Sequence, residues 1–291
     1  MYVIIYLIIE LLRMNYSNLG GVNTLGLGKL ERDQYSALLR ETHVTITVKE
    51  AASILGLANN KASMLLSLLA KKGWLKRIYY GVYLPVPLES PTSNTVAEEP
   101  FVIAEKLFSP CYIGGVNAVS HWDLTEQMFR TITVMSQKPV RKRHETIAGC
   151  EYYIHTTQAC YFFGLKSVWL NDVKIHISDP TRTIIDLLMF PESCGGIRFI
   201  VDVIQAYYRS QHKDFDLMIA YLEQTKNGAV IKRLGFLIEK FFPDEEKLIQ
   251  FCLMNLTKGY AKLSTAMDCD KLVSRWSLWV PSGWKEICHD S

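Results

Sequence analysis

The side chains with the clearest chemical potential lie in a short segment that begins near Asn59. Its apolar residues recur at helical spacing: Ala62, Leu65, Leu66 and Leu69. The opposite helical face carries short polar and basic side chains and no carboxylate: Asn60, Lys61, Ser63, Met64, Ser67 and Lys71. Amide and hydroxyl groups can hydrogen-bond base edges in the major groove of DNA, and lysine can contact phosphate. The spacing therefore predicts a nucleic-acid recognition helix; the plainer alternative is a helix with a solvated lysine face.

The elements before this segment predict how it is positioned. Thr47 and Glu50 have the spacing of a capping box, in which each side chain binds the backbone N–H of the other residue. Val48, Ala51, Ala52 and Leu55 then form one apolar helical face, and Gly56 ends that helix. Residues 56–58 have the length of a helix-turn-helix turn, after which Asn59 is expected to cap the second helix. Gly73 is expected to end it in the left-handed conformation.

A β-hairpin is predicted directly after the second helix. Residues 74–80 and 82–86 are strand-prone and meet at Gly81, with Val82, Leu84 and Val86 alternating inward. A helix over residues 29–41, with Leu30, Tyr35, Leu38 and Leu39 inward, and a short strand at residues 45–47 complete a winged helix-turn-helix over residues 29–90. The wing tip offers Tyr79 and Tyr80 for a phosphate or minor-groove contact, although hairpin packing explains them equally well. The predicted DNA-contacting residues are Thr47, Asn59, Asn60, Lys61, Ser63, Ser67, Lys71, Lys72, Arg77, Tyr79 and Tyr80.

Charge is distributed unevenly along the chain. Residues 29–90 hold nine Lys/Arg against five acidic residues, whereas the remainder holds 23 against 24. Positive charge is thus concentrated where phosphate contact requires it. The seven cysteines show no CxxC pair and no zinc-finger spacing, which favours reduced thiols in a cytoplasmic protein with no metal and no cofactor.

The first 28 residues are interpreted as an N-terminal extension. Residues 1–13 are strongly apolar but too short to span a bilayer, and they lack the flanks of a signal peptide. Translation from an upstream start codon, or a helix packed on the body of the protein, explains them best; a membrane anchor is the weaker alternative.

A polar, proline-bearing break at residues 89–95 predicts a domain boundary. Residues 96–291 are expected to form an α+β domain with a mainly antiparallel sheet and a helical C-terminal half. Strands are predicted at residues 111–113, 131–135, 150–155 and 173–177, with a short strand-like piece near 277–281. Helices are predicted at residues 97–108, 116–122, 181–190, 197–208, 214–224 and 229–242. Asp179 and Pro180 have the types expected of an N-cap and a first helical residue.

Three features of this second domain could do chemistry. Gly114 and Gly115 with His121 and Asp123 could indicate acid–base catalysis or a nucleotidyltransferase glycine motif, but no D-x-D follows, so a helix-packing glycine turn is favoured. Asp186 is expected on the outer face of its helix. A second candidate surface, for nucleic acid or for opposing a toxin, comprises Lys138, Arg141, Lys142 and Arg143 in a basic run, and Lys232 and Arg233 on the exposed face of a helix. A solvated loop is the plainer explanation of the run.

The order of these elements resembles that of the AbiEi antitoxin family. The similar segments in the winged domain are residues 49–56 (KEAASILG), 68–77 (LLAKKGWLKR) and 81–83 (GVY). Those in the second domain are residues 114–122 (GGVNAVSHW), 178–186 (SDPTRTIID) and 232–239 (KRLGFLIE). Each motif is weak alone, and the resemblance depends on their order over residues 29–260.

The resemblance implies a transcriptional autorepressor and antitoxin of a type IV toxin–antitoxin system acting in abortive phage infection. The winged domain would bind operator repeats in double-stranded DNA. The second domain would neutralise a nucleotidyltransferase-like toxin from the same operon without a stable complex, and the protein would be a monomer or weak dimer with no membrane partner and no catalytic residues. Two alternatives remain: a nuclease or nucleotidyltransferase targeted by a winged helix, and a transcription factor whose second domain senses a ligand.

Overall fold

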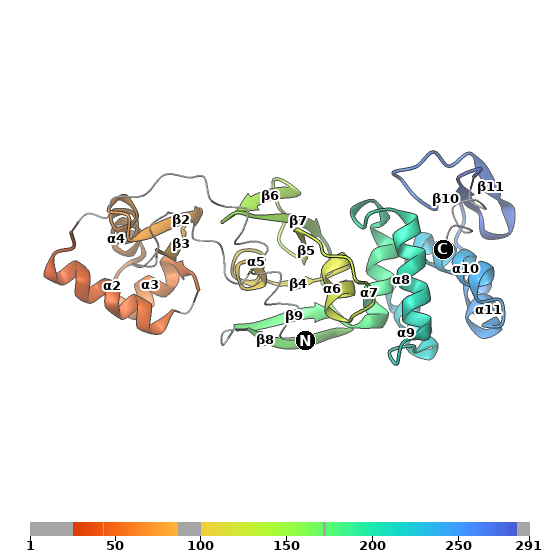
Figure 1. Ribbon diagram of the computed structural model, residues 1–291, viewed down its shortest axis with the longest axis horizontal. Helices are drawn as coiled ribbons and strands as arrows, with labels where there is room; N and C mark the ends of the chain where they lie inside the picture. Colours follow the sequence, from red (N-terminus) through yellow and green to blue (C-terminus); the bar gives the residue numbers. More distant parts are fainter. Residues whose placement is uncertain (1–25, 43, 87–99, 171–172, 284–291) are drawn as a thin grey trace.

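The computed structural model describes residues 26–42, 44–86, 100–170 and 173–283. These residues form a small helical unit with its own sheet, then a larger sheet, and then a layer of helices (Figure 1). The interpretations of residues 1–13 and of the break at residues 89–95 lie outside the described residues.

The first unit is a winged helix-turn-helix, as predicted. Three helices enclose a sheet of strand order β1-β3-β2, in which both pairings are antiparallel. The elements in chain order are α2 (Lys29–Glu41), β1 (Ile46–Thr47), α3 (Val48–Leu55), α4 (Asn59–Lys71), β2 (Leu75–Tyr79) and β3 (Val82–Pro85).

Local hydrogen bonds define the ends of the two central helices. The Thr47 hydroxyl accepts the N–H of Glu50 at 3.1 Å, and the Glu50 carboxylate accepts the N–H of Thr47 at 2.8 Å, which confirms the capping box. Gly56 ends α3 with φ 63°, and Gly73 follows α4 with φ 83°. The prediction that Asn59 caps α4 is wrong: Ala58 is the N-cap, without a side-chain hydrogen bond, and Asn59 is already helical.

The core of the winged unit is made by one face of each helix. Ala62, Leu66 and Leu69 of α4 are buried with Tyr35 and Leu38 of α2. The prediction that Leu30 and Leu39 also point inward is wrong, because both are exposed. Successive helical residues are rotated by about 100°, so only the stripe that holds Tyr35 and Leu38 can face the unit's core.

The second unit is built on a six-stranded sheet of order β6-β7-β5-β4-β9-β8. Three of its five pairings are antiparallel, as expected, but β5–β7 and β4–β9 are parallel, so the sheet is mixed. Helix α5 (Pro100–Phe108) contributes Val102, Ile103 and Phe108 to a core shared with this sheet. The strands are β4 (Cys111–Ile113), β5 (Thr131–Ser136), β6 (His144–Ile147), β7 (Cys150–Thr156), β8 (Leu165–Leu170) and β9 (Val173–Ser178).

A helical layer follows the sheet and surrounds α7 (Pro180–Met189), which is buried along most of its length. The other helices are α6 (Gly115–His121), α8 (Ile197–Arg209), α9 (Phe215–Thr225), α10 (Gly228–Phe241) and α11 (Glu246–Met254). A small terminal sheet of order β10-β12-β11 is formed by β10 (Ala261–Lys262), β11 (Lys271–Val273) and β12 (Leu278–Val280). Within the ranges given above, no helix is long and apolar enough to cross a membrane.

The two units touch through α3 and α5. Lys106 of α5 forms an ion pair with Glu50, the carboxylate that also caps α3. Val44 and Ile78 of the winged unit pack against the core formed by α5 and the large sheet. The end of α3 that carries the capping box is thus held against the second unit. The contact leaves the outer face of α4 exposed.

Candidate nucleic-acid interface

The outer face of α4 is open to solvent. Asn59, Asn60, Lys61, Met64 and Lys71 are exposed, and Ser63 and Ser67 are half-buried. No ion pair of Lys61 or Lys71 occurs among the residues that the structure describes. Two ammonium groups without a carboxylate beside them form the kind of surface that phosphate would neutralise.

The polar side chains of this face use only some of their hydrogen-bonding groups within the fold. The Asn60 side-chain oxygen accepts the N–H of Lys61 at 2.8 Å, which leaves its NH₂ group to donate elsewhere. Ser67 lies 3.2 Å from the hydroxyl of Tyr83 on β3 and so faces the hairpin rather than the centre of the surface. The Thr47 hydroxyl is used as an acceptor in the capping box and retains its own proton to donate.

Lys72 differs from the other two lysines. Its ammonium group lies 2.6 Å from the carboxylate of Glu31 on α2, and this partner lowers the pKa of Glu31. The expectation that Lys72 is available to phosphate is therefore corrected: it is already neutralised by a residue 41 positions earlier. The pair also removes Glu31 as a repulsive charge, because its carboxylate is occupied.

The β2–β3 hairpin presents the predicted wing. Gly81 adopts φ 72° at the turn, and Tyr80 is 86% exposed there, whereas Tyr79 is only marginally exposed. The Arg77 guanidinium lies 5.2 Å from the centre of the Tyr80 ring and donates to the Tyr79 carbonyl at 3.3 Å. Arg77 and Tyr80 thus form one cationic and aromatic patch at the wing tip.

The second candidate surface divides into two parts, one exposed and one buried. Lys138, Arg141, Lys142 and Arg143 are exposed in the connection between β5 and β6. Lys232 and Arg233, by contrast, are only 2% and 7% exposed, which corrects the prediction that they extend a basic patch. Lys232 donates to the carbonyl of Gly259, and Arg233 donates to the carbonyls of Leu188 and Lys262. Both cations tie α10 to distant backbone segments.

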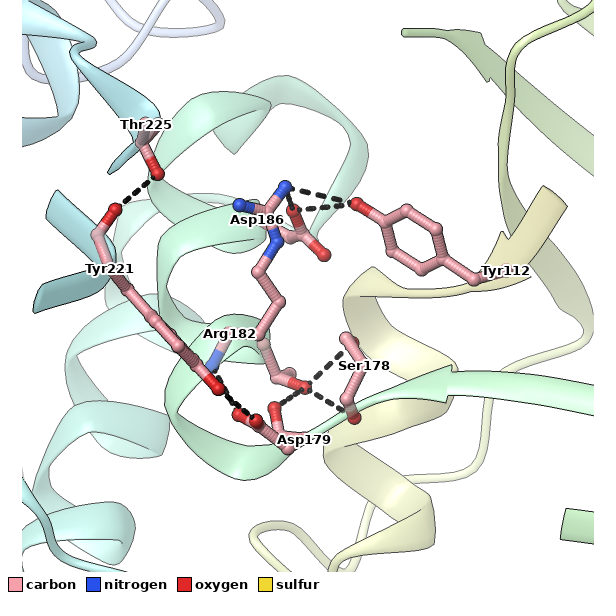
Figure 2. Close-up of polar contacts among 8 residues, drawn as sticks. Tyr112, Ser178, Asp179, Arg182, Asp186, Tyr221 and Thr225 are labelled. Atoms are coloured by element: carbon pink, nitrogen blue, oxygen red, sulfur yellow. Dashed lines mark hydrogen bonds and ion pairs between the residues drawn. The ribbon is translucent and has the colours of Figure 1, made fainter. Parts of the chain in front are cut away.

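A buried polar cluster surrounds the N-terminal half of α7 (Figure 2). Arg182 lies 2.8 Å from Asp186, and the Tyr112 hydroxyl donates to Asp186 and accepts from Arg182, at 3.1 Å in each case. Asp186 is therefore not on an outer face, which corrects that prediction, and burial raises its pKa while Arg182 opposes the rise. Asp179 caps α7 as predicted and also accepts the hydroxyl of Tyr221 at 2.7 Å. The cluster joins β4, α7 and α9.

The glycine turn before α6 is a packing feature. Gly115 has φ 56°, and a Cβ atom there would lie 3.0 Å from the side chain of Thr133. A Cβ atom on Gly114 would lie 3.2 Å from the Asp186 carboxylate. Both glycines allow α6 to approach the sheet, as the favoured interpretation predicted. Nowhere in the described part of the chain do three His, Cys, Asp or Glu side chains group to hold a metal ion.

The chain thus combines a winged helix-turn-helix unit, whose α4 has an open outer face, with an α+β second unit. Comparison with known families agrees: residues 33–86 match the family described as a transcriptional regulator, AbiEi antitoxin. The winged segment is thus similar to the domain of the AbiEi antitoxin family, which supports a role as regulator and antitoxin. No curated protein matches the chain. The motifs from Gly114 onward lie outside this match, and their similarity to the family is a resemblance of short segments only.

Proposed function

We propose that this protein is an autorepressor that binds operator DNA through α4 and the wing. The observation that carries the proposal is the outer face of α4, where Lys61 and Lys71 are exposed with no acidic partner among the described residues. Asn60, next to Lys61, has donor capacity left to read a base edge. Arg77 and Tyr80 of the wing supply further contacts, and the repressor acts in the cytoplasm as a monomer or weak dimer on repeated sites.

Titration of the upstream DNA of its own operon with the purified full chain tests this proposal. Lys61→Ala and Lys71→Ala are each expected to weaken binding at every sequence and to flatten the salt slope by about one, because each removes one phosphate contact. Asn60→Ala is expected instead to reduce the difference between operator and unrelated DNA. Lys271→Ala is the matched control, because it removes one exposed lysine from the second unit and so changes the net charge by the same amount. Wild-type affinity in Lys61→Ala, Lys71→Ala and Asn60→Ala alike would remove α4 as the recognition helix.

We further propose that residues 29–90 form the DNA-binding domain and that residues 96–291 form the antitoxin domain of a type IV system. This domain neutralises a nucleotidyltransferase-like toxin from the same operon without a stable complex and without catalysis of its own. The family match of the winged domain and the resemblance of the later motifs support this role. The exposed cations between β5 and β6 are the proposed surface, because such a toxin works on nucleic acid that cations can bind.

Co-expression with the neighbouring gene tests the antitoxin role. The neighbour alone is expected to stop growth, and this chain, expressed from an independent promoter, is expected to restore it. A Lys61→Ala, Lys71→Ala double variant should still protect, because protection does not require operator binding. Replacement of Arg141, Lys142 and Arg143 by alanine should abolish protection while operator binding persists. A neighbour that is harmless by itself would disprove the antitoxin role.

A further inference from the structure

The centre of the open face of α4 is apolar. Met64 is 72% exposed and Leu68, one turn later, is 40% exposed. Taking Met64 as the reference, helical geometry places Leu68 at about +40°, Lys61 at about +60° and Lys71 at about −20° around the axis. Two adjacent apolar side chains therefore lie between the lysines that the proposed function assigns to phosphate.

These two side chains are not needed for the core. The apolar residues that hold α4 in the winged unit are Ala62, Leu66 and Leu69, and all three are fully buried. A single exposed apolar residue is ordinary on a protein surface. Here the pair is distinguished by its place, since it lies between the two lysines proposed to contact phosphate, and no carboxylate interrupts it.

Chemistry restricts what such a pair can recognise. Leucine has no hydrogen-bonding group and the methionine thioether is only a weak acceptor, so neither side chain can satisfy the donors and acceptors on the edges of guanine, cytosine or adenine. Placed against those edges, they would leave base groups dehydrated and unpaired, which costs binding energy. The one apolar group in the major groove is the C5 methyl of thymine.

We propose that α4 reads thymine methyl groups at the centre of each binding site through Met64 and Leu68. This inference rests on the proposed operator binding and specifies its chemistry: the lysines hold the phosphates, and the apolar pair selects thymine over cytosine and over uracil. Met64 and Leu68 are then specificity-determining residues, and the helix presents them because its neighbours leave this face uncovered.

The test compares upstream operon DNA synthesised with thymine and the same DNA with every thymine replaced by uracil, which keeps the base pairing and the phosphates but lacks the methyl. The wild-type chain is expected to bind thymine DNA about fourfold more tightly for each methyl contacted, the effect of burying one such carbon group. Met64→Ala and Leu68→Ala should bind thymine DNA more weakly and should lose most of this preference. Leu30→Ala, which truncates a residue of α2 that is as exposed as Met64, should keep it.

The outcomes separate the two claims. If the wild-type chain shows no salt-dependent binding to thymine DNA, the proposed operator binding fails. If it binds thymine and uracil DNA equally, the thymine inference is overturned while operator binding stands. If wild type discriminates but the Met64→Ala, Leu68→Ala double variant discriminates to the same degree, the methyl is sensed elsewhere or through DNA shape, and the assignment to α4 is overturned. Both residues are exposed, so the variants are expected to fold, and unfolding curves check this.

Discussion

Reversing the charge of Lys61 and Lys71 together is expected to weaken binding to operon DNA by about four-thousandfold at about 0.1 M salt. Each phosphate contact contributes about eightfold at that salt concentration through released counterions, and a glutamate repels where the lysine attracted, so each reversal counts roughly twice. The structure shows both side chains exposed on one helix face. Fluorescence anisotropy or gel-shift titration over a range of salt concentrations measures the change.

A control with the same change in net charge decides whether position matters. Lys258 and Lys271 are exposed next to or within the small terminal sheet, which lies at the opposite end of the molecule from α4 (Figure 1). Reversing both should leave operator affinity within a few-fold of wild type, because salt screens charges beyond about 10 Å. If this control weakens binding as much as the Lys61→Glu, Lys71→Glu variant does, overall charge and not the face of α4 governs the interaction.

Replacing Arg182 with methionine is expected to lower the free energy of unfolding by about 3 to 5 kcal/mol, the usual cost of leaving one charge of a buried pair alone. Arg182 and Asp186 have side chains that are essentially inaccessible, and Tyr112 bonds to both (Figure 2). Methionine keeps most of the length of the arginine stem, so the loss reports the missing guanidinium rather than a cavity. Denaturant unfolding followed by circular dichroism provides the measurement.

The double variant Arg182→Met, Asp186→Leu is the informative partner of this experiment. It removes both charges, so much of the lost stability should return, as happens when buried ion pairs are exchanged for apolar residues. A loss below about 1 kcal/mol in Arg182→Met alone would mean that the pair contributes little. Full recovery is not expected, because the Tyr112 hydroxyl would remain buried without its two partners.

This cluster gives residues 178–186 an architectural role in the second unit. Asp179 caps α7 and bonds to Tyr221, while Asp186 and Arg182 bond to Tyr112. The first two turns of α7 thereby connect the sheet to α9. A motif of this kind can be maintained for architecture alone, so the chemistry of the second unit is better sought on its exposed cations.

The sequence by itself determined the elements whose signals are local. The bounds of α2, the capping box of Thr47 and Glu50, the glycine ends of α3 and α4, and the cap at Asp179 all depend on residues within a few positions of one another. Hydrogen bonds of such short span can be predicted directly from residue type and spacing. The acid-free face of α4 was readable for the same reason, since helical periodicity alone assigns its members.

Tertiary structure decided which charged groups are free and which are used internally. Lys72 is neutralised by Glu31 across 41 positions, and Arg233 reaches carbonyls 45 positions before it and 29 after it. Strands β6 and β8 and helix α11 also escaped prediction; β6 and β8 are edge strands with mostly polar or mixed patterns. Periodicity shows that a side chain leaves its own helix axis on a given side. Whether that side faces solvent or a distant backbone segment depends on tertiary packing, which local sequence patterns do not predict.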